Sequence, residues 1–454
     1  MQSDSIKFDT EEIVDAAPVG KFQILIWFLG TSVIFIDGFN IQVMGYLMPK
    51  LVQTWHISHA LIGPIASSGL LGVFTGYLIL SPFAGRIGHR RMMIWCTLLV
   101  AFGTLATTLA TDAYSMMALR YLTGIALGAS NPSAVLIISD FAPRRVRSTF
   151  VTAGIVGVSL GSMAAGLVAV AVLHRFGWQG VLWVGGLVPL VLTFVLAALT
   201  PNTFDYLINR KHDQQTVLKL VKRLNPTAHF SEGTQFFTGT KLQSASVSEL
   251  FTRSRVVGTI GIWISFSANL LVYYFIQSWL TQLVVQYGHS QQVAVTATTV
   301  LMLGGVTSFL LIGPLMDRFS PYKVLGFYFL VSGGTVALLG SLLSGSVALI
   351  MAAAFLVGLS VSGLQKGMNA VSVFYYPTAL RATGLGWGLG IGRLGAVVGP
   401  TLAGILMEAH LSTPVLFYWT AVPLVVASAA QFVMHKTYYR GPRNVETPQR
   451  LVAD

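Results

Sequence analysis

Four charged side chains stand inside long apolar stretches of this chain: Asp37, Arg120, Lys366 and Arg393. A charge in hydrocarbon is costly, so such a residue faces a cavity, a partner or a ligand. Asp37 is the only carboxylate near the middle of any stretch. A buried carboxyl group balanced by a nearby cation can take up and release a proton near neutral pH. Asp37 is therefore the candidate proton carrier. The competing interpretation is a buried ion pair that only holds two helices together.

A partner for Asp37 is available in Arg120, which stands at a similar depth in another apolar stretch. The two can form an ion pair. The alternative is that the Arg120 side chain extends to the outer surface of the bilayer. Asn40 follows Asp37 by one helical turn and so shares its helix face. We assign the proton-coupling site to these three residues, with Asn40 as a neutral donor and acceptor.

Lys366 and Arg393 have no carboxylate at their depth in the same half of the chain. Two unpaired cations in hydrocarbon need an anion, and the carboxylate of a substrate would supply one. Arginine can hold a carboxylate through two parallel hydrogen bonds. The alternative is that both cations bind backbone carbonyl groups at helix breaks near Gly363, Gly367 or Gly392.

Polar and aromatic side chains in the same stretches are candidates for the walls of a binding cavity. Aromatic rings offer flat apolar surfaces for the ring of a ligand. For any one of these residues, ordinary helix or lipid packing is the competing interpretation. The candidates are Asn131, Asn269, Tyr273, Tyr274, Gln277, Trp279, Gln365 and Asn369.

The elements that must position these residues are membrane helices. Hydrophobic residues make up 54% of the 454 residues and charged residues 10%, against roughly 25% charged in soluble domains. Crossing a bilayer takes about 20 apolar residues. Twelve stretches meet that length, at about 22–48, 60–82, 92–111, 114–140, 149–172, 179–199, 256–286, 293–315, 323–343, 347–376, 383–408 and 414–435. The predicted fold class is an all-α membrane protein with twelve transmembrane helices.

The basic residues fix the predicted orientation. If the N-terminus is cytoplasmic, all but five of the 28 Lys and Arg residues fall on the cytoplasmic side. The five exceptions are Lys50, Arg120, Arg175, Lys366 and Arg393. Positive charge concentrates in cytoplasmic loops of membrane proteins. Both termini are therefore predicted to be cytoplasmic.

The net charge of +12 does not indicate nucleic-acid binding, because the basic residues lie in short clusters between apolar stretches. The single cysteine, Cys96, excludes an intramolecular disulfide. The chain has no paired Cys and His spacing typical of a metal site, and no nucleophile–base pair. We expect no metal, no cofactor and no enzymatic activity.

The chain divides into two halves that share sequence features at corresponding positions. Residues 200–255 form the longest polar segment, predicted as a cytoplasmic linker with a short amphipathic helix near 214–224. On either side, 22–199 and 256–435 are predicted six-helix bundles, and 1–21 and 436–454 are predicted cytoplasmic tails. The separation between Pro82 and Pro314 is 232 residues, and Arg86 and Arg318 have the same separation. Such a repeat is the architecture of transporters that rock two bundles about a central site.

Charged residues in the predicted cytoplasmic loops are candidates for latching that side closed. The simpler interpretation is that these charges only set the orientation of the helices in the membrane. The more specific hypothesis is that they also take part in gating. They are Arg86, Arg90, Asp140, Arg147, Asp317, Arg318 and Arg381.

Two sets of motifs carry a family resemblance. The loop after the second stretch resembles the Gly-x-x-x-Asp-Arg-x-Gly-Arg-Arg motif of the major facilitator superfamily at Arg86, Gly88 and Arg90. Within that superfamily the chain resembles the aromatic acid:proton symporter family. The matching segments are Asp37-Gly38-Phe39-Asn40, Arg120 to Gly124, Ser278-Trp279-Leu280, and Tyr376 to Pro400 with Arg381, Trp387 and Arg393. The family usually has a second Asp where this chain has Asn40.

The resemblance implies a major facilitator fold and uptake of aromatic carboxylates with protons across a bacterial inner membrane. The expected partners are a small carboxylate, protons and the lipid bilayer, and we expect a monomer. Two alternatives stay open. One is a symporter for another organic anion, such as a dicarboxylate or a sugar acid. The other is a drug–proton antiporter, although Gly154–Gly166 lacks the proline typical of such exporters.

Overall fold

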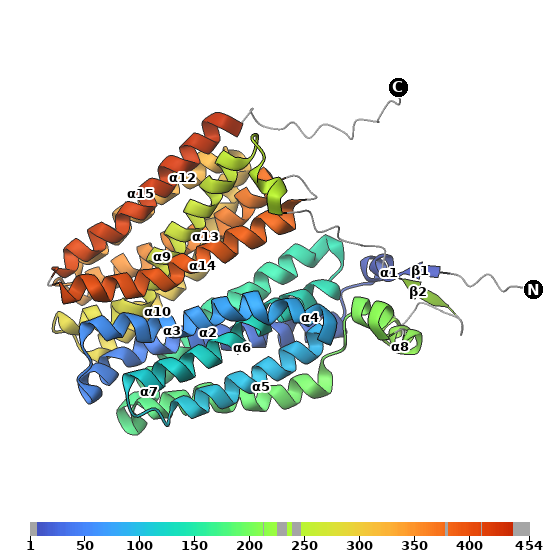
Figure 1. Cartoon of the computed structure of the whole chain (residues 1–454), viewed down its shortest axis with the longest axis horizontal. Helices are drawn as coiled ribbons and strands as arrows, with labels where there is room; N and C mark the ends of the chain where they lie inside the picture. The colour runs from blue at the N-terminus through green and yellow to red at the C-terminus, as the bar shows by residue number, and fades with distance from the viewer. Residues whose placement is uncertain are drawn as a thin grey trace, which may run out of the picture.

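The computed structural model describes residues 7–211, 213–224, 234–237, 247–376, 380–409 and 411–438. It is helical almost throughout (Figure 1). The helices are α1 (Thr10–Ala16), α2 (Lys21–Trp55), α3 (His59–Ile79), α4 (Ser81–Ile87), α5 (His89–Thr107), α6 (Ala113–Asp140), α7 (Arg144–Leu199), α8 (Gln214–Leu224), α9 (Val256–Gln286), α10 (Gln291–Thr307), α11 (Phe309–Arg318), α12 (Pro321–Leu342), α13 (Val347–Tyr375), α14 (Arg381–Glu408) and α15 (Thr413–Tyr438). The π-helix η1 (Tyr206–Lys211), the 3₁₀ helix η2 (Val247–Phe251) and the strands β1 (Lys7–Asp9) and β2 (Gln235–Phe237) complete the described elements.

Each of the twelve predicted stretches corresponds to a helix. In the described part of the chain, nine helices are long and apolar enough to cross a membrane. One of them, α7, contains two predicted stretches, joined at Gly177, whose φ of +64° is a conformation that favours glycine. The remaining two stretches correspond to α5 and to α10 with α11, which a break at Ser308 separates. The all-α prediction is confirmed.

The long helices form two groups. In Figure 1, α2 to α7 lie together and α9 to α15 lie together, and the two groups diverge toward the end that carries α1 and α8. At the other end they are in direct contact. Ser67 of α3 donates to the carbonyl oxygen of Val397 in α14 at 2.9 Å, and Thr401 donates to the Ser67 hydroxyl at 3.0 Å. The exact limits of the two predicted bundles stay a prediction.

Small residues bring α14 close to α9. A Cβ atom at Gly395 would collide with the carbonyl oxygen of Ser267, and one at Gly399 with that of Leu271. Glycine in membrane helices permits this close approach of backbones. Both positions lie within two helical turns of Arg393, so the close packing of α14 on α9 holds this part of α14 in place.

A small clasp formed by β1, α1, α8 and β2 lies beside the first helix group (Figure 1). The strands pair in parallel, with Phe8 opposite Phe236. The apolar side chains of α1 and α8 join a core that includes Phe141 and Phe204 at the ends of the membrane helices. Arg144 of α7 holds the clasp in place through ion pairs with Glu11 at 2.5 Å and Asp15 at 3.1 Å. The amphipathic helix predicted near 214–224 is confirmed as α8.

The helix termini show ordinary capping chemistry. Asp112 caps α6 by accepting hydrogen bonds from the backbone N–H groups of Tyr114 and Ser115. The N–H groups of Ser115 and Tyr114 hold the pKa of the Asp112 carboxyl below its usual range. Hydrogen bonds of this kind favour the charged form.

Candidate functional site

A polar cluster lies where the two helix groups face each other. Asp37 of α2 is buried, with 4% of its surface exposed. Asn131 of α6 donates to the Asp37 carboxylate, with 2.6 Å between Nδ2 and Oδ2. The other carboxylate oxygen has no hydrogen-bond partner among the described residues. A buried acceptor left unsatisfied is costly, so this oxygen is available to a proton or a cation.

Arg393 of α14 is the cation whose charge acts on Asp37, although the ion pairs within 4.0 Å among the described residues do not include these two side chains. The two side chains interact electrostatically, and both also interact with Tyr77 of α3 and Tyr274 of α9. The Arg393 guanidinium lies 5.0 Å from the centre of the Tyr77 ring, within the range of a cation–π interaction. Its Nη2 atom also contacts the Tyr77 hydroxyl at 3.4 Å. Arg393 therefore joins residues of both helix groups.

The predicted ion pair between Asp37 and Arg120 is wrong in this conformation. Arg120 donates from Nη2 to the backbone carbonyl of Asn40, and the ion pairs of the described residues do not include it. It is 3% exposed, so the alternative interpretation, in which Arg120 extends to the membrane surface, does not fit this structure either. Its Nε and Nη1 atoms have no partner among the described residues. Arg120 reaches α2, as its depth predicts, but its side chain points to Asn40 and not to Asp37.

Asn40 faces α5 rather than Asp37. Its amide group donates to the Ile36 carbonyl at 3.2 Å, and its side-chain oxygen accepts from the Thr104 hydroxyl at 2.8 Å. These bonds occupy both ends of the amide group. The predicted role of Asn40 as a donor or acceptor to Asp37 or to a bound acid does not fit this geometry.

Lys366 of α13 has protein partners. Its ammonium group donates to the Gly305 carbonyl at 2.7 Å and to the Ser308 hydroxyl at 2.8 Å. Gly305 lies in the last turn of α10 and Ser308 at the break between α10 and α11, and the Ser308 hydroxyl also donates to the Gly305 carbonyl at 2.7 Å. Of the two interpretations drawn from the sequence, this geometry favours binding to a backbone carbonyl over binding to a substrate. The break is at a different place from those predicted.

The predicted lining residues differ in whether other protein groups satisfy their polar atoms. Trp279 donates to the Pro400 carbonyl at 3.0 Å and is fully buried, so its contacts are those of helix packing. Asn269 donates to Gln365 at 3.1 Å. Side-chain oxygens without a partner in the described part of the chain remain on Asn269, Gln277 and Asn369. These three stay candidates for contact with a ligand.

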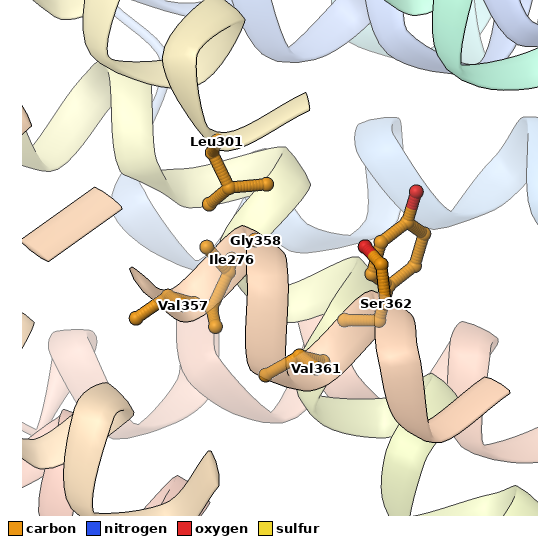
Figure 2. Close-up of a pocket in the computed structure, with 7 residues that line it drawn as sticks. Ile276, Leu301, Val357, Gly358, Val361 and Ser362 are labelled. Atoms are coloured by element: carbon orange, nitrogen blue, oxygen red, sulfur yellow. The ribbon is translucent and has the colours of Figure 1, made fainter. Parts of the chain in front are cut away.

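Tyr273 lines a small pocket between α9, α10 and α13 (Figure 2). The pocket has an empty volume of about 160 Å³, and its walls are Tyr273, Ile276, Leu301, Val357, Gly358, Val361 and Ser362. The free space between these side chains does not admit a water molecule. In this conformation the pocket is a gap in the helix packing and not a ligand site.

The predicted gating residues make local contacts. Arg90 donates to the Thr200 and Ala197 carbonyls at the end of α7, and Asp140 accepts from the Phe204 backbone at 2.9 Å. Arg147 donates to the Ala142 carbonyl at 3.1 Å, whereas Arg86 and Arg318 are exposed. The side chains of Asp317 and Arg381 lie outside the described residues. The gating role of all seven stays a prediction.

Two residues of the site were missed by the sequence analysis. Tyr77 lies in the stretch 60–82 and Thr104 in the stretch 92–111. Tyrosine and threonine are common in membrane helices, so neither carries a signal of its own. Only their contacts with Arg393 and Asn40 identify them.

The chain matches the family model of the Major Facilitator Superfamily over residues 30–311 and again over 262–452. Its relatives include the gallate transporter of Pseudomonas putida, 33% identical over 93% of this chain and 94% of the relative. Another is the 4-hydroxybenzoate transporter PcaK of Pseudomonas aeruginosa, 32% identical over 93% and 95%. A third is the benzoate transport protein of Acinetobacter baylyi, 26% identical over 95% and 93%.

Solved structures agree on the fold. The D-xylose–proton symporter matches with a TM-score of 0.72 and 14% identity, over 91% of this chain and 98% of that one. A bacterial homologue of the human lysosomal transporter Spinster, in an inward-facing conformation, matches with a TM-score of 0.71 and 16% identity, over 93% and 98%. The chain belongs to the major facilitator superfamily, in its aromatic acid:proton symporter family.

Proposed function

We propose that this protein imports an aromatic carboxylate together with protons by alternating access. The observation that carries the proposal is the position of Arg393. It combines a guanidinium group, which can hold a carboxylate in two hydrogen bonds, with two tyrosine rings, Tyr77 and Tyr274. The same guanidinium interacts with Asp37 from the other helix group.

The names of the relatives support the class of substrate. Gallate, 4-hydroxybenzoate and benzoate each combine one aromatic ring with one carboxylate. A ring needs flat apolar walls, and a carboxylate needs a cation. The surroundings of Arg393 provide both in one place.

Competition for Arg393 would couple the proton to the substrate. A guanidinium group that holds one carboxylate in two hydrogen bonds still has three N–H donors, but its single positive charge is then balanced by the substrate and no longer compensates Asp37. When a substrate carboxylate binds Arg393, Asp37 loses its cation while it remains buried. An uncompensated buried carboxylate is costly and is relieved by protonation. Substrate and proton would therefore be loaded together.

Alternating access would separate the same groups again. Asp37 lies in the first helix group and Arg393 in the second, so rocking the groups changes the distance between them. In the proposed orientation, with both termini in the cytoplasm of a bacterial cell, the end at which the groups diverge faces inward. The protein would work as a monomer in the inner membrane, with the closed end outward.

Uptake into proteoliposomes tests the proposal. Purified protein is reconstituted, and radiolabelled benzoate, 4-hydroxybenzoate and gallate are supplied with and without an inward proton gradient. We expect accumulation of at least one of these acids only with the gradient. Accumulation of a dicarboxylate or a sugar acid but of no aromatic acid would contradict the proposed substrate class. Gradient-driven efflux of a cationic drug would instead show an antiporter.

A further inference from the structure

The Asp37 carboxylate has partners on both sides of the boundary between the helix groups. Arg393, whose charge acts on it, belongs to α14 of the second group. Asn131 belongs to α6 of the first group, which also contains Asp37, and donates to the carboxylate at 2.6 Å. Rocking the two groups against each other changes the distance to Arg393. The bond to Asn131 lies within a single group.

The place of Asp37 within the first group is fixed at the next residue, Gly38. A Cβ atom at Gly38 would collide with the carbonyl oxygen of Val158 in α7, so α2 and α7 pack backbone to backbone at this turn. The Ser162 hydroxyl of α7 also donates to the Gly38 carbonyl at 3.1 Å. These contacts hold the turn that carries Asp37 against α7.

The turn of α6 that carries Asn131 is fixed in the same group. Pro132 lies inside α6 and has no N–H group, so the Gly128 carbonyl lacks its usual partner in the helix. The Ser81 hydroxyl of α4 donates to this carbonyl at 3.3 Å. A Cβ atom at Gly128 would also collide with the Val73 carbonyl oxygen of α3. Contacts with α3 and α4 therefore hold the Asn131 amide group in its place beside Asp37.

The other groups around Asp37 do not replace this donor. Those that interact with its charge are Arg393, Tyr77 and Tyr274, of which only Tyr77 belongs to the first group. Arg120 donates to the Asn40 carbonyl instead, and the described contacts of α7 with this turn of α2 bring no charge. Among the described residues, Asn131 is therefore the hydrogen-bond donor that stays with Asp37 when the groups separate.

We propose that Asn131 is a positioning residue that enables Asp37 to release its proton on the cytoplasmic side. A hydrogen bond donated to a carboxylate favours its charged form. Once Arg393 has moved away, a buried carboxyl group without a donor would keep its proton. With Asn131 in place, the O–H bond of Asp37 breaks, the proton passes to cytoplasmic water, and the amide N–H holds the carboxylate that is left. This inference rests on the proposed function and adds a residue to its coupling step.

Asn131→Leu should change the pH dependence of net uptake, because leucine is similar in size but has no donor. Uptake of a radiolabelled aromatic acid into proteoliposomes is measured at several inner pH values with a proton gradient of constant size. The inner pH of half-maximal uptake should rise by about one unit, the effect of one hydrogen bond to a charged group. Exchange of labelled for unlabelled substrate needs no proton release and should change little. Asp37→Asn, in contrast, should show no net uptake at any inner pH.

Infrared difference spectroscopy follows the same proton without any substrate. The C=O band of a protonated carboxyl group that is lost in Asp37→Asn identifies Asp37. In a pH titration, the midpoint of this band should also rise by about one unit in Asn131→Leu. The matched control is Ser133→Ala in the same helix, whose hydroxyl donates to the Ala129 carbonyl at 3.0 Å. It should leave the midpoints of both assays unchanged.

The outcomes separate the two proposals. Reduced uptake at every inner pH with unchanged midpoints would show that Asn131 only holds α6 against α2, and would overturn the inference. If Asn131→Leu does not fold, Asn131→Ala, which also lacks the donor but adds no bulk, takes its place in both assays. If the unaltered protein takes up no aromatic acid, the proposed function fails, while the infrared titration still decides whether Asn131 controls the proton on Asp37.

Discussion

Asp37 is the residue on which the proposed coupling depends. It is buried, accepts a hydrogen bond from Asn131, and the cation that acts on it, Arg393, belongs to the other helix group. A structural ion pair would give no reason to leave one carboxylate oxygen without a hydrogen-bond partner in the described part of the chain. The arrangement fits a group that exchanges a cation for a proton during each cycle.

Asp37→Asn should abolish accumulation driven by a proton gradient. The amide is nearly the same size as the acid but cannot release a proton, so substrate movement loses its link to the gradient. Exchange of labelled for unlabelled substrate at equal concentrations should persist. Both are measured in proteoliposomes. If the variant still concentrates substrate under a proton gradient, Asp37 is not the proton carrier.

Arg393→Gln should weaken binding of a carboxylate substrate by roughly 2–4 kcal/mol, as expected when one partner of a buried charge pair is removed. The uncharged amide analogue of the same substrate should lose far less. Binding to the purified protein is measured by calorimetry for acid and amide. An equal loss for the two compounds would show that Arg393 only holds the helices together through Tyr77.

Asn40→Asp should stabilise the protein through Arg120. Arg120 donates to the Asn40 backbone through one nitrogen atom, and its other two side-chain nitrogen atoms have no partner among the described residues. A buried charge without a counterion is strongly destabilising. A carboxylate at position 40 would supply the counterion and raise Tm by about 2–4 °C. Asn40→Ala, which loses the bond to Thr104 and adds no charge, is the control and should lower Tm. A lower Tm for Asn40→Asp would show that Arg120 is satisfied in another way.

Among the elements, the clasp shows how segments distant in the sequence are joined. The strand β1 pairs with β2 across more than two hundred residues, and α1 packs on α8. A parallel pair of three-residue strands is weak by itself. The apolar core under α8 and the contacts of Arg144 and Arg145 with α1 hold it in place.

Arg144→Ala should loosen the clasp without unfolding the membrane helices. The ion pairs of Arg144 lie at the surface, where such pairs contribute about 0–1 kcal/mol, so Tm should barely change. Hydrogen–deuterium exchange followed by mass spectrometry should rise in α1 and β1. Arg91→Ala, at another exposed site, is the control and should leave that exchange unchanged. Unaltered exchange in Arg144→Ala would mean that the apolar core alone holds the clasp.

At the scale of the whole molecule, the two helix groups meet closely at one end and diverge at the other (Figure 1). At the closed end, a Cβ atom at Gly63 in α3 would collide with the Pro400 carbonyl in α14. Ser67 and Thr401 bond directly across the same boundary. An alternating-access cycle must open these contacts.

A disulfide across the closed end should stop transport. The Ser67 and Thr401 oxygens are 3.0 Å apart, so Ser67→Cys with Thr401→Cys places two sulfur atoms within bonding reach. The experiment uses a Cys96→Ala background, which removes the one native thiol. Oxidation should abolish uptake and a reducing agent should restore it, while each single cysteine variant stays active. Full uptake by the cross-linked protein would contradict alternating access at this boundary.

The sequence by itself determined the helical architecture and the residues able to do chemistry. Apolar length determined the helices, because a bilayer requires roughly 20 apolar residues to cross. The cost of charge in hydrocarbon singled out Asp37 and Arg393, and the clustered basic loops predicted the orientation. These rules act on one helix at a time, so they can be applied without knowing which helices are neighbours.

The tertiary structure decided which of these residues meet. Depth along a helix follows from position in the sequence, and it placed Arg120 beside α2 as predicted. The direction in which a side chain points does not follow from its depth. Successive side chains point about 100° apart around the helix, and packing decides which face of the helix meets which neighbour. That packing directs Arg120 to Asn40 and leaves Arg393, from the other helix group, to act on Asp37. The break at Ser308, which gives Lys366 its partners, lies inside an unbroken apolar stretch. Only contacts between helices reveal such features, because the side chains that make them come from segments far apart in the chain.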